Sequence, residues 1–323
     1  MEIDDINCHN GVHCVFSTLV SVYQHFNKSV NEPIVFMNCD RELTFEIKDA
    51  DTLKNVILSN HLGRIATDFY EKNDIHISLK KFNYGLADFI KYVHSCVKKG
   101  YPVAVFLKSE YLKYNRVFKD SDNKHCVLII GFEKNGFIFA DSFIPTFPST
   151  CYKGTIEYED FYTAWSKSNK LYYEIDYESL RREIPLESVK EKMSKHTLGL
   201  SAVDAIAEFV RNIPQLYSED EIRRNLKYFN FKINYDSILP LRKLLLKCLI
   251  YMEENDAELD FREEKNCLES IVSSWYSVEL SLLRCTLRPE KENFLKVSKI
   301  IYKINENEKV LSMKIKQILS RNN

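Results

Sequence analysis

Residues 7–14, NCHNGVHC, run directly into residues 15–26, VFSTLVSVYQHF. The first segment is polar and turn-forming and carries two thiols and two imidazoles. The second segment is predicted to be a helix, because its apolar residues recur at helical spacing on one face (Leu19, Val22, Tyr23 and Phe26). Cys14 is therefore expected at the start of a helix, where unpaired N–H groups and the positive end of the dipole favour an anion such as a thiolate. This position makes Cys14 a candidate nucleophile, although most cysteines are simply small buried apolar residues.

Composition and charge indicate a soluble globular protein. The chain has 323 residues, which predicts one large or two ordinary domains, and 45% of them are hydrophobic. The net charge of −1 offers no overall field that would attract nucleic acid or an anionic membrane. No apolar run approaches the ~18 residues that a membrane span needs. The acidic start, MEIDD, lacks the basic and apolar regions of a signal peptide, so we expect a cytoplasmic protein.

Nine cysteines, an odd number spread over the whole chain, are expected to be thiols in a reducing compartment. Four side chains of the types that bind metal ions lie close together in the sequence: Cys8, His9, His13 and Cys14. A structural zinc site uses such atoms but needs a second clustered pair, which the sequence lacks. We therefore expect no bound metal.

The periodicity of the sequence changes near residue 178. Before it, strands and helices alternate, which predicts an α+β domain over residues 1–178, with strands near 74–82, 101–107, 125–132, 136–141, 155–158 and 171–175 and helices near 86–97 and 159–165. Residues 33–36 are interpreted as a short strand or loop entry, 41–50 as strand-like and 53–70 as weakly helical. Beyond it, residues 190–323 predict an all-helical domain, with helices near 201–213, 218–230, 236–254, 258–286 and 291–319.

The two strands at 125–132 and 136–141 form the strongest hairpin signal, and they carry His125 and Asp141. A nucleophilic cysteine needs a base, and the base needs a group that orients its ring. If the turn is centred on Lys134, His125 lies opposite Phe143 and Asp141 is a diagonal neighbour on the same face. If residues 135–136 form a two-residue turn, His125 lies opposite Thr146 and Asp141 points to the other face. A Cys14–His125–Asp141 triad therefore requires the first register.

Several motifs together resemble the papain-like cysteine enzymes: Cys14 at the head of an apolar helix, HCVLIIGF from residue 125 and FADS over 139–142. Among them the chain is most similar to the family named for the butirosin-biosynthesis acyltransferase. That family has a His-Cys pair opening its first helix, as at residues 13–14, and a Tyr-Leu-x-Tyr stretch before the catalytic histidine, as at 111–114. Residues 152–165 also resemble its pattern. The chain departs from the family at Lys108 and Lys113, where the family commonly has Asp and Pro, so we expect an altered substrate loop. Ser142 also replaces the proline often found after the aspartate.

The resemblance implies a papain-like catalytic domain followed by an all-helical domain, with Cys14, His125 and Asp141 as the triad. It implies an amide-forming acyltransferase of specialised-metabolite (antibiotic-type) biosynthesis. Such an enzyme takes an acyl group from the phosphopantetheine thioester of an acyl or peptidyl carrier protein and passes it to a small amine. It binds no cofactor of its own.

The remaining candidate residues surround this chemistry. Oxyanion stabilisation is expected from the backbone N–H of Cys14 together with the side chain of Asn10 or Asn7. We expect the substrate pocket to include His13, Tyr111, Tyr114 and Phe143, although aromatic residues at such positions also serve as ordinary packing.

Two other functional classes remain open. A cysteine peptidase or amidase uses the same chemistry, but related leader peptidases carry a glutamine six residues before the nucleophile, where this chain has Cys8. A non-catalytic binding module on the same fold is the third class. Cys8 is also the rival nucleophile, and it lies too far before the predicted helix to benefit from the helix dipole.

Overall fold

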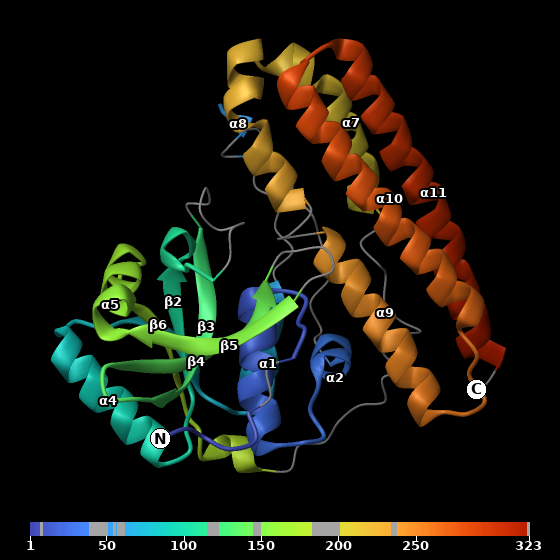
Figure 1. The fold of residues 1–323 in the computed structure, drawn as a ribbon. Coiled ribbons are helices and arrows are strands. Elements are labelled where there is room, and N and C mark those ends of the chain that lie inside the picture. The colour runs from blue at the N-terminus through green and yellow to red at the C-terminus, as the bar shows by residue number, and fades with distance from the viewer. Residues whose placement is uncertain are drawn as a thin grey trace. The chain divides into compact units, whose positions relative to one another are not determined.

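The computed structural model describes residues 1–6, 9–38, 51–53, 56, 62–114, 123–144, 150–182, 201–233 and 238–321 (Figure 1). The chain divides into two compact units. The first contains Met1–Cys39 and Leu62–Pro185, and the second contains Asp40–His61 and Leu186–Asn323. The first unit is mixed α+β, whereas the described residues of the second are mainly helical.

A six-stranded antiparallel sheet forms the centre of the first unit, with strand order β1-β6-β2-β3-β4-β5. The strands are β1 (Ile77–Lys81), β2 (Val103–Lys108), β3 (Lys124–Phe132), β4 (Gly136–Ile144), β5 (Thr150–Glu157) and β6 (Leu171–Ile175). The long runs of buried apolar residues in β2 and β3 explain why these two strands are central.

Helices cover both faces of this sheet (Figure 1). They are α1 (Cys14–Phe26), α2 (Glu32–Met37), α3 (Leu62–Lys72), α4 (Leu86–Lys98) and α5 (Tyr158–Lys167). On one face, an aromatic cluster joins α4, α5 and β4, in which Phe89 packs 4.0 Å from Trp165 and 6.2 Å from Phe137 between ring centroids. On the other face, α1 packs against β3 and β4. This packing brings the first residue of α1 close to the end of the sheet at which β3 begins.

The prediction for residues 33–36 was wrong, because they lie in helix α2. The side chain of Asn31 caps this helix by accepting a hydrogen bond from the backbone N–H of Ile34 (3.0 Å), and Pro33 is tolerated in the first turn. The helix predicted over 53–70 begins only at Leu62 within the described residues. Residues 41–50 lie outside them.

In its described residues, the second unit contains helices α7 (Ser201–Leu216), α8 (Glu219–Phe231), α9 (Ile238–Asn255), α10 (Arg262–Leu287) and α11 (Lys291–Arg321). A buried ion pair joins Arg242 of α9 to Glu308 of α11 through two hydrogen bonds of 2.9 and 2.6 Å. Asp40–His61 also belong to this second unit, whereas the predicted boundaries placed them in the first domain. Two hydrogen bonds connect the segment to α8 and the residue after it: the N–H of Leu53 donates to Glu221 (2.9 Å), and the carbonyl of Val56 accepts from Lys232 (2.8 Å).

Candidate active site

The register of the β3–β4 hairpin brings His125 and Asp141 together. Leu128 pairs with Ala140, and continuing this register three residues further along each strand sets His125 opposite Phe143. Closer to the turn the register differs by one residue, because Ile130 is an extra residue in β3 between Ile129 and Gly131. The register at Leu128, extended to His125, is thus the first of the two alternatives. It allows His125 Nε2 to lie 2.8 Å from Asp141 Oδ2.

The Asp141 carboxylate is fully buried and surrounded by hydrogen-bond donors. Besides His125, its Oδ2 accepts from the hydroxyl of Tyr114 at 2.5 Å, and its Oδ1 accepts from the backbone N–H of Phe143 at 3.0 Å. Tyr114 is fixed in turn by stacking on Tyr152, with ring centroids 4.3 Å apart. Burial, followed by the negative charge of Asp141, raises the pKa of Tyr114 well above its ordinary value, so the phenol stays protonated and donates.

The His125 imidazole connects this carboxylate to Cys14. Burial disfavours the charged ring, but the Asp141 carboxylate and hydrogen bonds to Asp141 and Cys14 outweigh it, and together they raise the pKa of His125 to about 10. Because Asp141 takes Nε2, the other ring nitrogen, Nδ1, remains for the Cys14 sulfur. The three residues predicted as a triad are therefore adjacent, with His125 in the middle.

Cys14 is the first residue of α1, as the sequence predicts. The helix is capped by His13, whose Nδ1 accepts from the backbone N–H of Phe16 at 3.4 Å. Burial and the nearby His125 lower the pKa of His13 to about 4, so its ring is neutral and acts as an acceptor. One turn later, the hydroxyl of Thr18 donates to the backbone carbonyl of Cys126 at 3.4 Å. This contact fixes α1 beside the residue that follows His125.

The loop before Cys14 is held by a buried hydrogen-bond network that sequence reasoning missed. Ser17 Oγ accepts from the backbone N–H groups of Val12 (2.9 Å) and His13 (3.3 Å) and donates to Glu32 (2.5 Å). The N–H of Gly11 donates to the carbonyl of Ser142, 2.6 Å away. A Cβ at Gly11 would lie 2.2 Å from Ser17 Oγ, so only glycine fits. The sequence signal for this network was Gly11 in the turn-forming segment before the helix.

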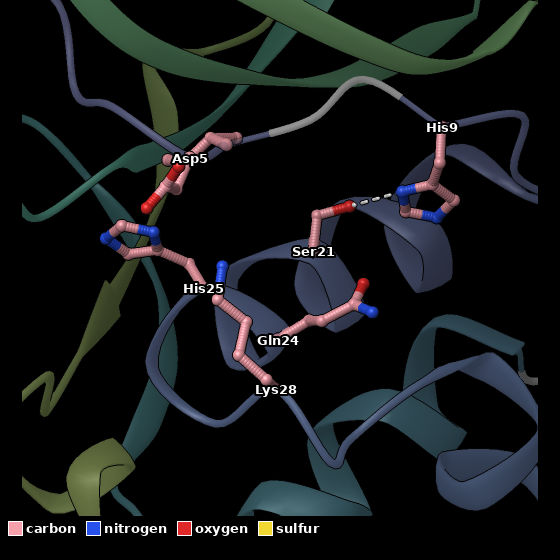
Figure 2. A pocket seen from close by; sticks show the side chains of 7 residues that line it. Asp5, His9, Ser21, Gln24, His25 and Lys28 are labelled. Atoms are coloured by element: carbon pink, nitrogen blue, oxygen red, sulfur yellow. Dashed lines mark hydrogen bonds between the residues drawn. The ribbon is translucent and has the colours of Figure 1, made fainter.

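A pocket of about 240 Å³ lies along α1 (Figure 2), and its lining includes neither Cys14 nor His125. It is lined by Asp5, Ile6, His9, Ser21, Gln24, His25 and Lys28. His9 Nδ1 lies 3.3 Å from Ser21 Oγ, which in turn lies 3.3 Å from Ser142 Oγ, directly after Asp141 in β4. The pocket thus adjoins the residues that support the nucleophile loop rather than the sulfur itself.

The other predicted residues have different surroundings. Asn10 is exposed, and Tyr111 is half-buried at the end of a 3₁₀ turn. Phe143 is buried beside Asp141. Asn7 and the rival nucleophile Cys8 lie outside the described residues, and so does part of the four-residue set considered for zinc. Within the described ranges, no group of three or more His, Cys, Asp or Glu side chains is arranged to hold a metal ion.

Comparison with known proteins gives no family assignment. No protein-family model matches the chain, and no curated protein matches it. Among the described helices, none combines the length and the apolar character that crossing a membrane requires.

The pH dependence of His125 tests the electrostatics of the site. The folded-state pKa lies above the ordinary value of 6.5, so the charged ring contributes stability fully below pH 6.5, and this contribution is lost as the pH rises toward 10. We expect NMR titration of the ring to find His125 still protonated at pH 8. In Asp141→Asn the pKa should fall, because burial then opposes the charged ring without the Asp141 carboxylate to offset it. An unchanged titration in this variant would contradict the assignment.

Removal of the Ser17 hydroxyl tests the loop network. Ser17→Ala leaves two backbone N–H groups and the Glu32 carboxylate without this partner, which should cost ~1–3 kcal/mol of unfolding free energy. Urea unfolding measures the loss through Trp165 fluorescence in a Trp275→Phe background, because the chain has 2 tryptophans. Ser29→Ala, which removes an exposed hydroxyl, is the control and should cost less than ~0.5 kcal/mol. Equal effects of the two substitutions would contradict a structural role for Ser17.

Proposed function

We propose that this chain is a papain-like, cysteine-dependent acyltransferase that forms amides. One observation carries the proposal: His125 Nε2 lies 2.8 Å from Asp141 Oδ2, and the same ring hydrogen-bonds the Cys14 side chain, for which Nδ1 remains. This is the arrangement that a thiol nucleophile, a base and an orienting carboxylate need. The motifs that resemble the butirosin-type acyltransferases support the choice of acyl transfer within this chemistry.

The first half-reaction loads the enzyme. The Cys14 thiolate attacks the carbonyl carbon of an acyl thioester carried on the phosphopantetheine of an acyl or peptidyl carrier protein. The tetrahedral intermediate collapses, the C–S bond to the carrier breaks, and the protonated His125 gives its proton to the departing pantetheine thiolate. Cys14 then holds the acyl group as a thioester, and His125 is neutral.

The second half-reaction makes the amide. A small amine attacks the Cys14 thioester while His125 accepts a proton from its nitrogen. When the new tetrahedral intermediate collapses, the C–S bond to Cys14 breaks, the amide leaves, and the thiolate–imidazolium pair is restored. Every step uses groups of this chain and the two substrates, so no cofactor of the enzyme itself is required.

The negative oxygen of both intermediates needs hydrogen-bond donors. As the first residue of α1, Cys14 has a backbone N–H for which the helix offers no acceptor. Helix N-termini stabilise negative charge, which supports this N–H as one donor. The exposed Asn10 side chain, three residues before the helix cap, is our candidate for the second donor, with Asn7 as the alternative. Tyr111 and Phe143 stay as predicted pocket walls.

Tyr114 has a second role in this proposal beside the substrate pocket. Its hydroxyl donates to the same Asp141 oxygen that His125 bonds. A donor at this oxygen holds the carboxylate in place and keeps it oriented toward the ring. We therefore assign Tyr114 as a positioning residue.

Trapping the acyl-enzyme tests the proposal. The chain is mixed with a short-chain acyl carrier protein, or with an acyl thioester of N-acetylcysteamine, and measured by intact-protein and peptide mass spectrometry. We expect one acyl group on Cys14, released as an amide when a primary amine is added. Asp141→Asn should load more slowly by roughly a hundredfold, since the base loses its orienting partner.

Two variants serve as controls. Cys14→Ala should carry no acyl group, whereas Cys151→Ala, which removes another partly buried thiol of the same unit, should load normally. Loading that persists in Cys14→Ala would contradict the proposal. Cleavage of a peptide with no thioester-derived adduct would favour a peptidase, and the absence of both activities would favour a binding module.

A further inference from the structure

Helix α10 exposes three leucines over its last two turns. Leu280, Leu283 and Leu287 are 58%, 42% and 73% exposed. Their spacing of three and four residues aligns them on one face of the helix. Leu268 and Leu282 of the same helix are buried, so the exposed row is not needed for its packing. We call Leu280, Leu283 and Leu287 the α10 leucine stripe.

A basic groove lies beside this stripe, where α10 ends and α11 begins. It has a volume of about 660 Å³, and its lining includes Leu287 of the stripe. Its charged lining residues are Arg284, Arg288 and Lys296 against the single carboxylate of Glu290. The groove and the stripe therefore form one continuous surface that is apolar on one side and positively charged on the other.

The basic side chains of the groove differ from other basic side chains of the same unit in their ion pairing. Arg223, Lys265 and Lys309 each form an ion pair with a carboxylate. In the part of the chain that the structure describes, no ion pair involves the side chains of Arg284, Arg288 or Lys296. The three cations outnumber the single carboxylate of Glu290, so the groove carries a net positive charge that is available to an approaching anion.

We propose that this surface binds an acidic amphipathic helix of a partner protein. The apolar residues of that helix pack on the α10 leucine stripe, and its carboxylates face Arg284, Arg288 and Lys296 in the groove. Apolar anchors combined with complementary charges are how amphipathic helices are recognised in grooves. The proposal concerns the helical unit and is independent of the acyl-transfer chemistry.

Two other occupants fit the surface less well. In a symmetric dimer of this chain, the same basic groove would approach itself, and like charges would repel. A membrane interface is broad and flat, whereas the basic residues here line a concave groove that admits side chains. A helix with acidic side chains satisfies both the charge and the shape.

The test uses the full-length chain and two designed helical peptides that share a leucine seam. One peptide has glutamates flanking the seam, and its twin has lysines there. Fluorescence anisotropy at low ionic strength should show tighter binding of the glutamate peptide. Arg284→Glu/Arg288→Glu should weaken that binding about tenfold or more, and Leu283→Ser should weaken it as well.

Matched controls lie toward the other end of α11. Lys316→Glu/Arg321→Glu reverses two exposed charges, and Met313→Ser removes a side chain that is 57% exposed. Both should leave binding unchanged, and circular dichroism checks that all variants are folded. Equal binding of the two peptides, or binding that survives the Arg284→Glu/Arg288→Glu change, would overturn the proposal. Stripe-dependent dimers, or stripe-dependent binding to phosphatidylglycerol vesicles without peptide binding, would overturn it too.

Discussion

The extra residue in β3 is the constraint on which the candidate site depends. Near the turn, Phe132 pairs with Phe137, and continuing that register would set His125 opposite Ile144 and turn Asp141 to the other face of the sheet. Ile130 shifts the register by one residue before His125 is reached. The N-terminal segment supports this bulge, because the N–H of Ile3 donates to the carbonyl of Ile130 at 2.8 Å. A local irregularity of the backbone thus decides whether a carboxylate faces the imidazole.

The same end of the sheet also fixes Cys14. Helix α1 is held by hydrogen bonds from Thr18 to β3 and between Ser21 and Ser142 of β4, and the loop before it is held by the N–H of Gly11 on the carbonyl of Ser142. Those two strands carry His125 and Asp141, so nucleophile and base are positioned by shared elements rather than by separate loops. Buried polar groups such as Ser17 and Glu32 make this arrangement specific, since each has a hydrogen-bond partner that a shifted helix would lose. This is how distant parts of the sequence form one site.

Much of the architecture follows from sequence periodicity, and the exceptions have physical causes. The helix beginning at Cys14, the β3–β4 hairpin and the five helices predicted after residue 178 were recognisable because their apolar patterns are long. Residues 33–36 were misjudged because a β-branched run is ambiguous at that length, and the capping role of Asn31 decided the outcome. The contact of Tyr114 with Asp141 depends on tertiary packing, so its sequence pattern showed only an aromatic residue. The register stayed open because the sequence does not mark the bulge at Ile130.

The central claim is that the Cys14 sulfur and the His125 ring form a reactive pair. The rate of alkylation by iodoacetamide, followed at each cysteine by peptide mass spectrometry at mildly acidic pH, tests this most directly. We predict that Cys14 reacts much faster than Cys96, Cys126 and Cys151, and that His125→Ala abolishes the difference. If Cys14 reacts no faster than these cysteines, or if its rate is unchanged in His125→Ala, the pair does not exist and the proposed chemistry fails.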